Sequence, residues 1–401
     1  MNPLLQLSPT NIPLSLYIHI PWCVKKCPYC DFNSHALPIS QAGVMSDTPF
    51  GEYVDALIAD LISQQSFIQG RKIHSIFIGG GTPSLLPVAE FQRLFSALKN
   101  LVEFEKDYEI TLEVNPGTVE HAPFDDYLGI GINRLSIGVQ SFDHDSLKAL
   151  GRIHNPTQAI NAIINAKQSG FHRINVDLMH GLPNQTVELA IKDLEQAMMA
   201  GATHLSWYQL TIEPNTAFYR MPPNLPHDET LENIEEAGQQ LLTAWGFRHY
   251  EVSAWAGKKD KACQHNLNYW QFGDYLAIGA GAHGKVTLRQ HDDFGDGIYR
   301  FSKSRLPKDY LNFSPSNSPK MINFTKIAEE NLPFEFMMNA LRLRHGVTTQ
   351  MFEERTGLLV SSIDNELLPL QHEGLMVHDA TLLSPTAMGF RYVNHLVRAF
   401  L

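Results

Sequence analysis

Short apolar segments alternate with longer amphipathic ones over the first half of the chain. The short segments are rich in branched and aromatic residues, which favours β-strands. They are residues 14–20, 74–78, 109–114, 134–139, 173–178 and 204–210. The segments between them carry apolar residues three and four positions apart, as helices packed on a sheet do. These predicted helices include residues 53–67, 88–101, 156–168 and 187–200.

Strand and helix in regular succession predict parallel strands joined by right-handed crossovers. Either a doubly wound sheet or a partial barrel satisfies this pattern. Polar and glycine residues cluster where the strands end: cysteines after the first strand, residues 79–82 after the second, then Glu113, Gln140 and Asp177. A barrel collects its site at the C-terminal ends of its strands. The pattern therefore favours an α/β fold with a partial (β/α)6 barrel, followed by additional strands.

The regular alternation ends near residue 215. Helical patterns are expected at residues 229–245, 323–343 and 361–372 and from Thr386 onward, with a short strand at 375–378. Residues 302–320 are rich in Pro, Ser and Asn and are typical of a linker. We therefore predict three parts: a barrel with its extension (1–300), a linker (301–322) and a small winged-helix-like domain (323–401).

Composition excludes several classes of protein. Hydrophobic residues make up 44% of the 401 positions and charged residues 18%, which is enough apolar content for a large core and excludes a mainly disordered chain. The net charge of −11, without a basic patch, excludes nucleic acid as a partner. No secretory signal or membrane-spanning run is evident, and four cysteines do not make a disulfide scaffold. These features predict a cytoplasmic protein.

Three cysteines, Cys23, Cys27 and Cys30, follow the first predicted strand with C-x3-C-x2-C spacing. Thiolates are soft ligands for zinc, copper(I) or iron–sulfur clusters. A zinc site would need a fourth ligand, and neither His35 nor Cys263 has a suitable spacing for it. Buried structural cysteines are the other alternative. The spacing favours an iron–sulfur cluster with one iron left open.

With Tyr29 before its last cysteine, this run resembles the signature of the radical S-adenosylmethionine (SAM) superfamily, C-x3-C-x-aromatic-C. Further segments resemble the oxygen-independent coproporphyrinogen oxidase branch of that superfamily. They are LYIHIPWC (16–23), GGGTPS (79–84), LEVNPGT (112–118), SIGVQSF (136–142), GRIH (151–154), DLMHGLPNQT (177–186), HNLNYW (265–270) and GDYLAIGAGAHG (273–284). The resemblance covers nearly the whole chain.

The resemblance implies a [4Fe–4S] cluster on the three cysteines, with SAM bound to its open iron through amino and carboxylate groups. One electron from the cluster would then cleave SAM. The implied contacts to SAM are Tyr17, Tyr29, Gly80, Gly81, Thr82, Glu113, Gln140, Arg152 and Asp177, with the glycine run at the methionine end and Glu113 on the ribose hydroxyls. Taken singly, such residues also serve as turns, helix caps or salt bridges.

Two departures distinguish the chain from the coproporphyrinogen oxidases. Phe32 stands where their signature has a fourth cysteine. His265, Tyr269 and Trp270 form an HNxxYW pattern that resembles a heme chaperone family within the superfamily. An imidazole can ligate heme iron, and Tyr and Trp offer flat apolar faces to a porphyrin. Cys263 is an alternative ligand, and other histidines are not excluded. The motif could instead pack the core, shape the SAM site or line an interface between domains.

The resemblance to the heme chaperone family therefore implies a protein that binds heme, SAM and a [4Fe–4S] cluster and passes heme to respiratory-chain proteins. A homodimer is compatible with this prediction. The alternative is an enzyme: an oxygen-independent coproporphyrinogen III dehydrogenase or another radical SAM activity that modifies heme.

Overall fold

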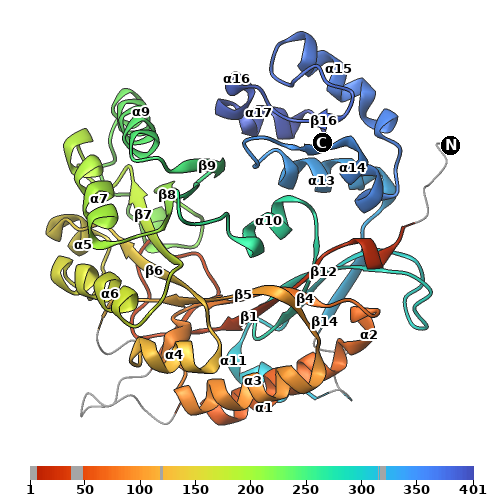
Figure 1. Ribbon diagram of the computed structural model, residues 1–401, viewed down its shortest axis with the longest axis horizontal. Helices are drawn as coiled ribbons and strands as arrows, with labels where there is room; N and C mark the ends of the chain where they lie inside the picture. The colour runs from red at the N-terminus through yellow and green to blue at the C-terminus, as the bar shows by residue number, and fades with distance from the viewer. Residues whose placement is uncertain (1–6, 38–47, 118–120, 315, 317–321) are drawn as a thin grey trace.

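The computed structural model describes residues 7–37, 48–117, 121–314, 316 and 322–401. One mixed sheet of twelve strands forms its centre, in the order β14-β13-β12-β11-β1-β4-β5-β6-β7-β8-β10-β9 (Figure 1). Its two edge strands, β14 and β9, do not pair with each other, so the curved sheet stays open. The predicted partial barrel is confirmed.

The six predicted strands run parallel to one another in this sheet. They are β1 (Leu14–Ile20), β4 (Ile73–Gly80), β5 (Phe104–Val114), β6 (Arg134–Gln140), β7 (Ile174–His180) and β8 (His204–Gln209). Most of their side chains are buried on both faces, which explains why the sequence shows apolar runs and not a polar–apolar alternation.

Further strands extend the sheet on both sides. On one side β11 (Asp274–Ile278) runs parallel to β1, and three antiparallel strands follow it. Those three are β12 (His283–Leu288), β13 (Gly297–Lys303) and β14 (Ile322–Lys326). On the other side β10 (Ala254–Ala256) and β9 (Arg248–Glu251) pair antiparallel beyond β8. The sequence predicted additional strands without their pairing.

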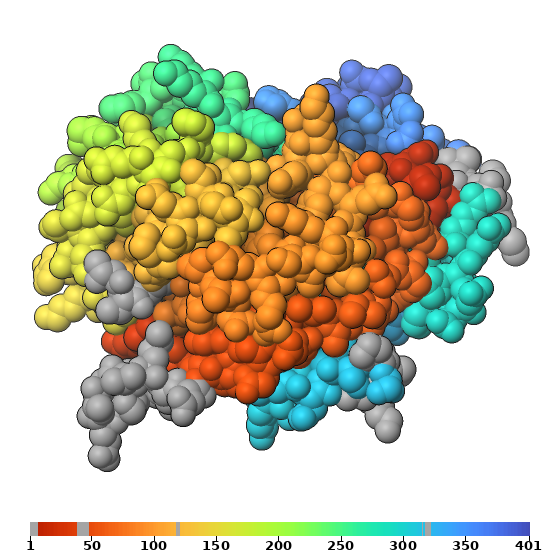
Figure 2. Space-filling model, turned by 60° about the horizontal axis from the view of Figure 1, so that its bottom comes forward, coloured from red at the N-terminus to blue at the C-terminus, as the bar shows by residue number. Residues whose placement is uncertain are grey.

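Helices cover the outer face of the sheet. Figure 2 shows the molecule from this side, where the segments coloured orange to yellow-green include most of these helices. They are α1 (Phe50–Ser63), α2 (Gln65–Ile68), α3 (Val88–Leu101), α4 (Phe124–Ile130), α5 (His144–Ala149), α6 (Pro156–Gln168), α7 (Val187–Ala200) and α9 (Asp228–Ala244). The bounds of α3, α6 and α7 are those predicted from the sequence. Side-chain caps from Asn155 and Thr186 begin α6 and α7.

The expected linker and the start of the C-terminal unit need correction. The predicted helix over 323–343 is wrong at its beginning, because residues 322–326 form β14 and pair with β13. The helix α13 (Leu332–Ala340) begins only at Leu332. Within the expected linker, β13 continues to Lys303 and α11 (Pro307–Tyr310) buries Tyr310 in the main core. Residues 315 and 317–321 of that linker, like Thr118 of the LEVNPGT segment, lie outside the described residues.

The C-terminal unit is mainly helical. It contains α13, α14 (Thr349–Thr356), α15 (Asp364–His372), α16 (Ala387–Arg391) and α17 (Val393–Arg398). The strand predicted at 375–378 is wrong: Met376 makes only an isolated bridge to Pro385, and the two-stranded sheet is β15 (Val347–Thr348) with β16 (Leu382–Leu383). The helix predicted from Thr386 begins there, with Thr386 as its cap, but it is divided at Tyr392 into α16 and α17.

The C-terminal unit packs against the β9–β11 region of the barrel (Figure 1). Its core includes Phe272 and Ile298 from the barrel together with Phe336. The backbone N–H of Val252 donates to the carbonyl of Arg342 at 3.0 Å. In the described residues, no helix is long and apolar enough to cross a membrane.

Candidate functional site

The predicted site residues converge at the C-terminal ends of the parallel strands. A cavity of about 400 Å³ lies there. Its lining includes Cys23, Cys27, Tyr29, Cys30, Gly80, Gly81, Thr82, Glu113, Gln140, Arg152 and Asp177. Apart from Tyr17, these are all of the residues predicted to hold the cluster and SAM. The barrel brings them together because consecutive parallel strands end at one edge of the sheet.

The cysteines lie on a loop that folds back on itself. Cys23 ends β2 (Trp22–Cys23), which pairs with β3 (His35–Ala36). Between these strands the Lys26 ammonium donates to the carbonyls of Phe32 and Ser34 at 3.0 and 3.3 Å. All three thiols are free. The loop therefore presents three cysteine sulfur atoms, none of them in a disulfide, to one cavity.

The glycine run after β4 holds this loop in place. The N–H of Gly81 donates to the Ile20 carbonyl at 2.8 Å, and the N–H of Thr82 donates to the Trp22 carbonyl at 2.7 Å. A Cβ on Gly81 would lie 2.5 Å from the Trp22 oxygen. The resemblance implied that this run meets the methionine end of SAM. The structure adds that glycine at position 81 lets the chain after β4 approach the backbone before Cys23.

The three thiols suit a cluster better than a single ion. Among the described residues, no set of three His, Cys, Asp or Glu side chains is close enough to hold one metal ion. In an iron–sulfur cluster each thiolate binds a different iron, so the sulfur atoms lie farther apart. Burial raises the pKa of the Cys23 thiol to about 11, a penalty that coordination to iron removes.

Two half-buried carboxyl groups, Glu113 and Asp177, line the same cavity as the cysteines. Burial, together with the negative charge of Asp177, raises the pKa of Glu113 to about 8. The N–H of Gly80 donates to Glu113 Oε2 at 3.2 Å. Burial also raises the pKa of Asp177, whose oxygens accept hydrogen bonds from Ser136 and Asn175. Half-buried carboxyls of this kind fit a ligand that brings hydroxyl donors or positive charge.

Asn115 and Tyr208 belong to the site, and the sequence analysis missed them. Asn115 Oδ1 accepts a hydrogen bond from Arg152 Nη2 at 2.7 Å, and its amide donates to Thr82 at 3.0 Å. The Tyr208 hydroxyl donates to Gln140 at 2.7 Å, and Gln140 has a positive φ of 70°. Asn115 follows Glu113 within the LEVNPGT segment, so its place after a strand was the signal that could have found it.

A second cavity, of about 680 Å³, adjoins the first and shares four lining residues with it: Asp31, Phe32, Gly80 and Glu113. Tyr17 lines this second cavity and not the first. Its hydroxyl donates to His19 Nδ1 at 2.9 Å, while His19 Nε2 donates to the Asn33 carbonyl at 2.9 Å. Burial lowers the pKa of His19 to about 4, which keeps its ring neutral, as this pair of bonds requires.

The HNxxYW residues lie on α10 (Gln264–Trp270) and point in different directions. Tyr269 lines the second cavity. His265 is 3% exposed, lines neither cavity and stacks on Phe77 with ring centres 4.9 Å apart. Trp270 packs against the C-terminal core, with Arg342 over its ring at 5.0 Å. The structure thus brings Tyr269, but not His265 or Trp270, to a cavity wall. Their roles toward heme stay a prediction.

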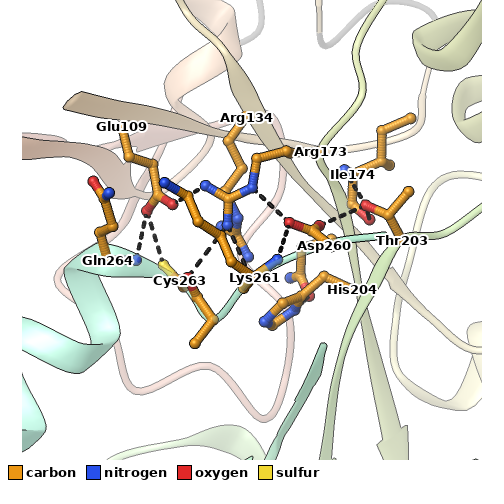
Figure 3. A network of polar contacts seen from close by, with 12 residues as sticks. Glu109, Arg134, Arg173, Ile174, Thr203, His204, Asp260, Lys261, Cys263 and Gln264 are labelled. Carbon is orange, nitrogen blue, oxygen red and sulfur yellow. Dashed lines mark hydrogen bonds and ion pairs between the residues drawn. The ribbon is translucent and has the colours of Figure 1, made fainter. Parts of the chain in front are cut away.

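Cys263 lies in a buried polar network at the N-terminal side of the strands (Figure 3). Its thiol donates to Glu109 at 3.2 Å, and Arg173 bridges Glu109 and Asp260. Burial raises the pKa of this thiol to about 12. A buried, protonated thiol that is engaged with a carboxylate has the surroundings of a structural cysteine.

A partial barrel with three cysteines at the ends of its strands is the architecture of radical SAM proteins, and comparison with known proteins gives the same class. Residues 17–197 match the Radical SAM superfamily, and residues 327–392 match the HemN C-terminal domain. The structure resembles the radical SAM enzyme coproporphyrinogen III oxidase (HemN) from Escherichia coli, with a TM-score of 0.77, 23% identity and coverage of 97% of this chain and 90% of that one. The chain is a member of the Radical SAM superfamily.

Within that superfamily the relatives are more specific. Heme chaperone HemW of Haemophilus influenzae is 49% identical over 397 residues, covering 97% of this chain and 98% of the relative. Heme chaperone HemW of Escherichia coli is 47% identical over 390 residues, with the same coverage. The chain belongs to the HemW family, which confirms the resemblance found in the sequence.

Proposed function

We propose that this protein is a heme chaperone that carries a SAM-coordinated [4Fe–4S] cluster and delivers heme to respiratory-chain proteins. The single observation that carries the cluster and SAM is the convergence of three free thiols with Glu113, Asp177 and Arg152 on one cavity. Membership of the HemW family supports the heme function.

Cys23, Cys27 and Cys30 would hold the cluster, and the strand ends around them would bind SAM. The half-buried carboxyl of Glu113 supplies an acceptor for ribose hydroxyls, and Arg152 supplies a cation that can bind a carboxylate. When bound, the cluster supplies an electron to SAM. The barrel positions both cofactors and limits access of water.

The alternative is an oxygen-independent coproporphyrinogen III dehydrogenase. Phe32 argues against it, because it replaces the fourth cysteine of that branch. Its ring is 62% exposed where the two cavities meet. The likeness to coproporphyrinogen III oxidase concerns the fold and does not extend to that reaction.

The decisive experiment uses protein reconstituted without air. We expect it to bind hemin with a shift in its absorption spectrum and to transfer heme to an apo-cytochrome of a respiratory complex. In parallel, the same protein is incubated with SAM, a reductant and coproporphyrinogen III. If protoporphyrinogen IX formed over many turnovers and no heme were transferred, the protein would be an oxygen-independent coproporphyrinogen III dehydrogenase and not a heme chaperone.

A further inference from the structure

The second cavity has the size and the lining of a site for a flat, anionic ligand. Its volume of about 680 Å³ lies in the range of roughly 300–1,000 Å³ typical of small-molecule sites. Aromatic rings from separate parts of the chain line it: Tyr17 on β1, Phe32 on the cysteine loop, Tyr269 on α10 and Tyr275 on β11. Such rings contact a planar macrocycle through their faces and edges.

His283 is the histidine best placed to reach iron in this cavity. It begins β12, is exposed, and lines the cavity. In the described residues its ring makes no hydrogen bond, whereas both ring nitrogens of His19, the other histidine of the lining, are engaged. Burial and the nearby Arg305 and Arg300 lower the pKa of His283, so its imidazole is in the neutral form that binds a metal.

Arg305 is the cation of the lining that no carboxylate of the described residues neutralises. It is exposed, and among the described residues it forms no ion pair. The other cation of the lining, Lys303, is fully buried and paired with Asp60. Asp31 and Glu113 also line the cavity, so an anionic group on the ligand is expected near Arg305 and away from these acids.

The part of the cavity wall that carries His283 and Arg305 is hydrogen-bonded to the cysteine loop. The Asn33 amide donates to the carbonyls of Ala280 and Arg305, both at 2.9 Å. A Cβ on Gly281 would lie 2.3 Å from Asn33 Nδ2, so the two segments are in close contact. The cysteine loop therefore supports both the second cavity and the proposed cluster site.

We propose that the second cavity binds heme, with the iron on His283, a propionate on Arg305 and the macrocycle against Tyr269 and Phe32. His265 then acts as a positioning residue: its ring meets Tyr269 edge-on at 4.6 Å and fills the space behind the cavity wall. This inference rests on the proposed function, and it assigns the ligand that the sequence left open.

The test compares hemin with iron-free protoporphyrin IX on the reconstituted full chain. For His283→Ala we expect hemin to bind about tenfold more weakly, with an altered Soret band, while protoporphyrin IX binds as before, since only the iron contact is lost. For Arg305→Glu we expect both ligands to bind about tenfold more weakly. The controls are His172→Ala and Arg391→Glu, both at exposed positions away from the cavities.

Cluster iron content checks that each variant is folded. Hemin binding that is unchanged in His283→Ala and abolished in His265→Ala, with cluster iron retained, would overturn the assignment and leave the chaperone function intact. Failure of the unaltered protein to bind hemin would instead overturn the proposed function. Equal weakening of hemin and protoporphyrin IX in His283→Ala would also contradict an iron contact.

Discussion

Arg152 Nη2 donates a hydrogen bond to Asn115 Oδ1 at 2.7 Å and a second one, also at 2.7 Å, to the carbonyl of Gly138. Its Nη1 lies 3.7 Å from the sulfur of Cys27. The guanidinium is thus fixed between two strand ends and the cysteine loop. Because arginine keeps its charge at all ordinary pH values, this arrangement places a permanent positive charge beside the thiols.

Asn115→Ala should weaken SAM binding about tenfold without changing cluster content, because Arg152 loses the side-chain acceptor that orients it together with the Gly138 carbonyl. Equilibrium binding of SAM to the reconstituted protein measures the effect. Asn165→Ala, on the exposed side of α6, is the matched control. Unchanged SAM affinity in Asn115→Ala would show that Asn115 does not position Arg152 for binding.

Each of Cys23→Ser, Cys27→Ser and Cys30→Ser should lose most of its iron and sulfide after reconstitution, from an expected content of about four irons per chain. Cys263→Ser should keep the full content, because Cys263 lines neither cavity and a serine can still donate to Glu109. Iron and sulfide analysis of all four variants measures the difference between Cys263→Ser and the other three. Full iron in any of the first three would remove that residue from the ligand set.

Gly81→Ala should destabilise the apo-protein by about 1–3 kcal/mol, because the added methyl group meets backbone atoms that cannot move aside freely. The Trp22 oxygen would lie 2.5 Å from it. Gly129→Ala is the control: nothing lies within 4 Å of its Cβ, and alanine favours the helix α4. Chemical denaturation measures both. Equal stability of the two variants would show that the close contact between Gly81 and the Trp22 backbone does not require glycine at position 81.

Glu113→Gln should stabilise the apo-protein increasingly as pH rises. The pKa of Glu113 is about 8 in the folded protein against its ordinary value of 4.5, so between these values the unfolded chain gives up a proton that the folded chain keeps. Stability of the unaltered protein therefore falls as pH rises through this window, and the glutamine variant lacks this loss. The gain should approach about 4 kcal/mol near pH 8 and stay below about 1 kcal/mol near pH 5.

Denaturation of both proteins over this pH range tests the prediction, with Glu373→Gln, at an exposed position on the C-terminal unit, as the control. A stability difference that does not vary with pH would mean that Glu113 is already ionised in the folded protein. Both proteins are measured without SAM, because bound SAM would change the charge around this carboxyl.

Local sequence patterns predicted the parallel strands and several helix bounds because those signals act over short distances. Asn155 and Thr186 supply side-chain oxygens that begin α6 and α7 wherever the helices later pack. Edge strands carry a weaker signal. In β14, Asn323 and Thr325 alternate with half-buried Ile322 and Phe324, and the pairing with β13 decides that this segment is a strand.

The amino-acid order alone determined the three-cysteine loop and the polar residues at the strand ends, since a parallel sheet must bring its strand ends to one edge. Only the tertiary structure decided which aromatic residues reach a cavity. His265 and Tyr269 lie one helical turn apart on α10, yet one is enclosed behind Tyr17 and Phe77 and the other lines the second cavity. Packing of α10 against β1 and β4 makes that difference, because burial depends on distant segments that meet only in the folded chain.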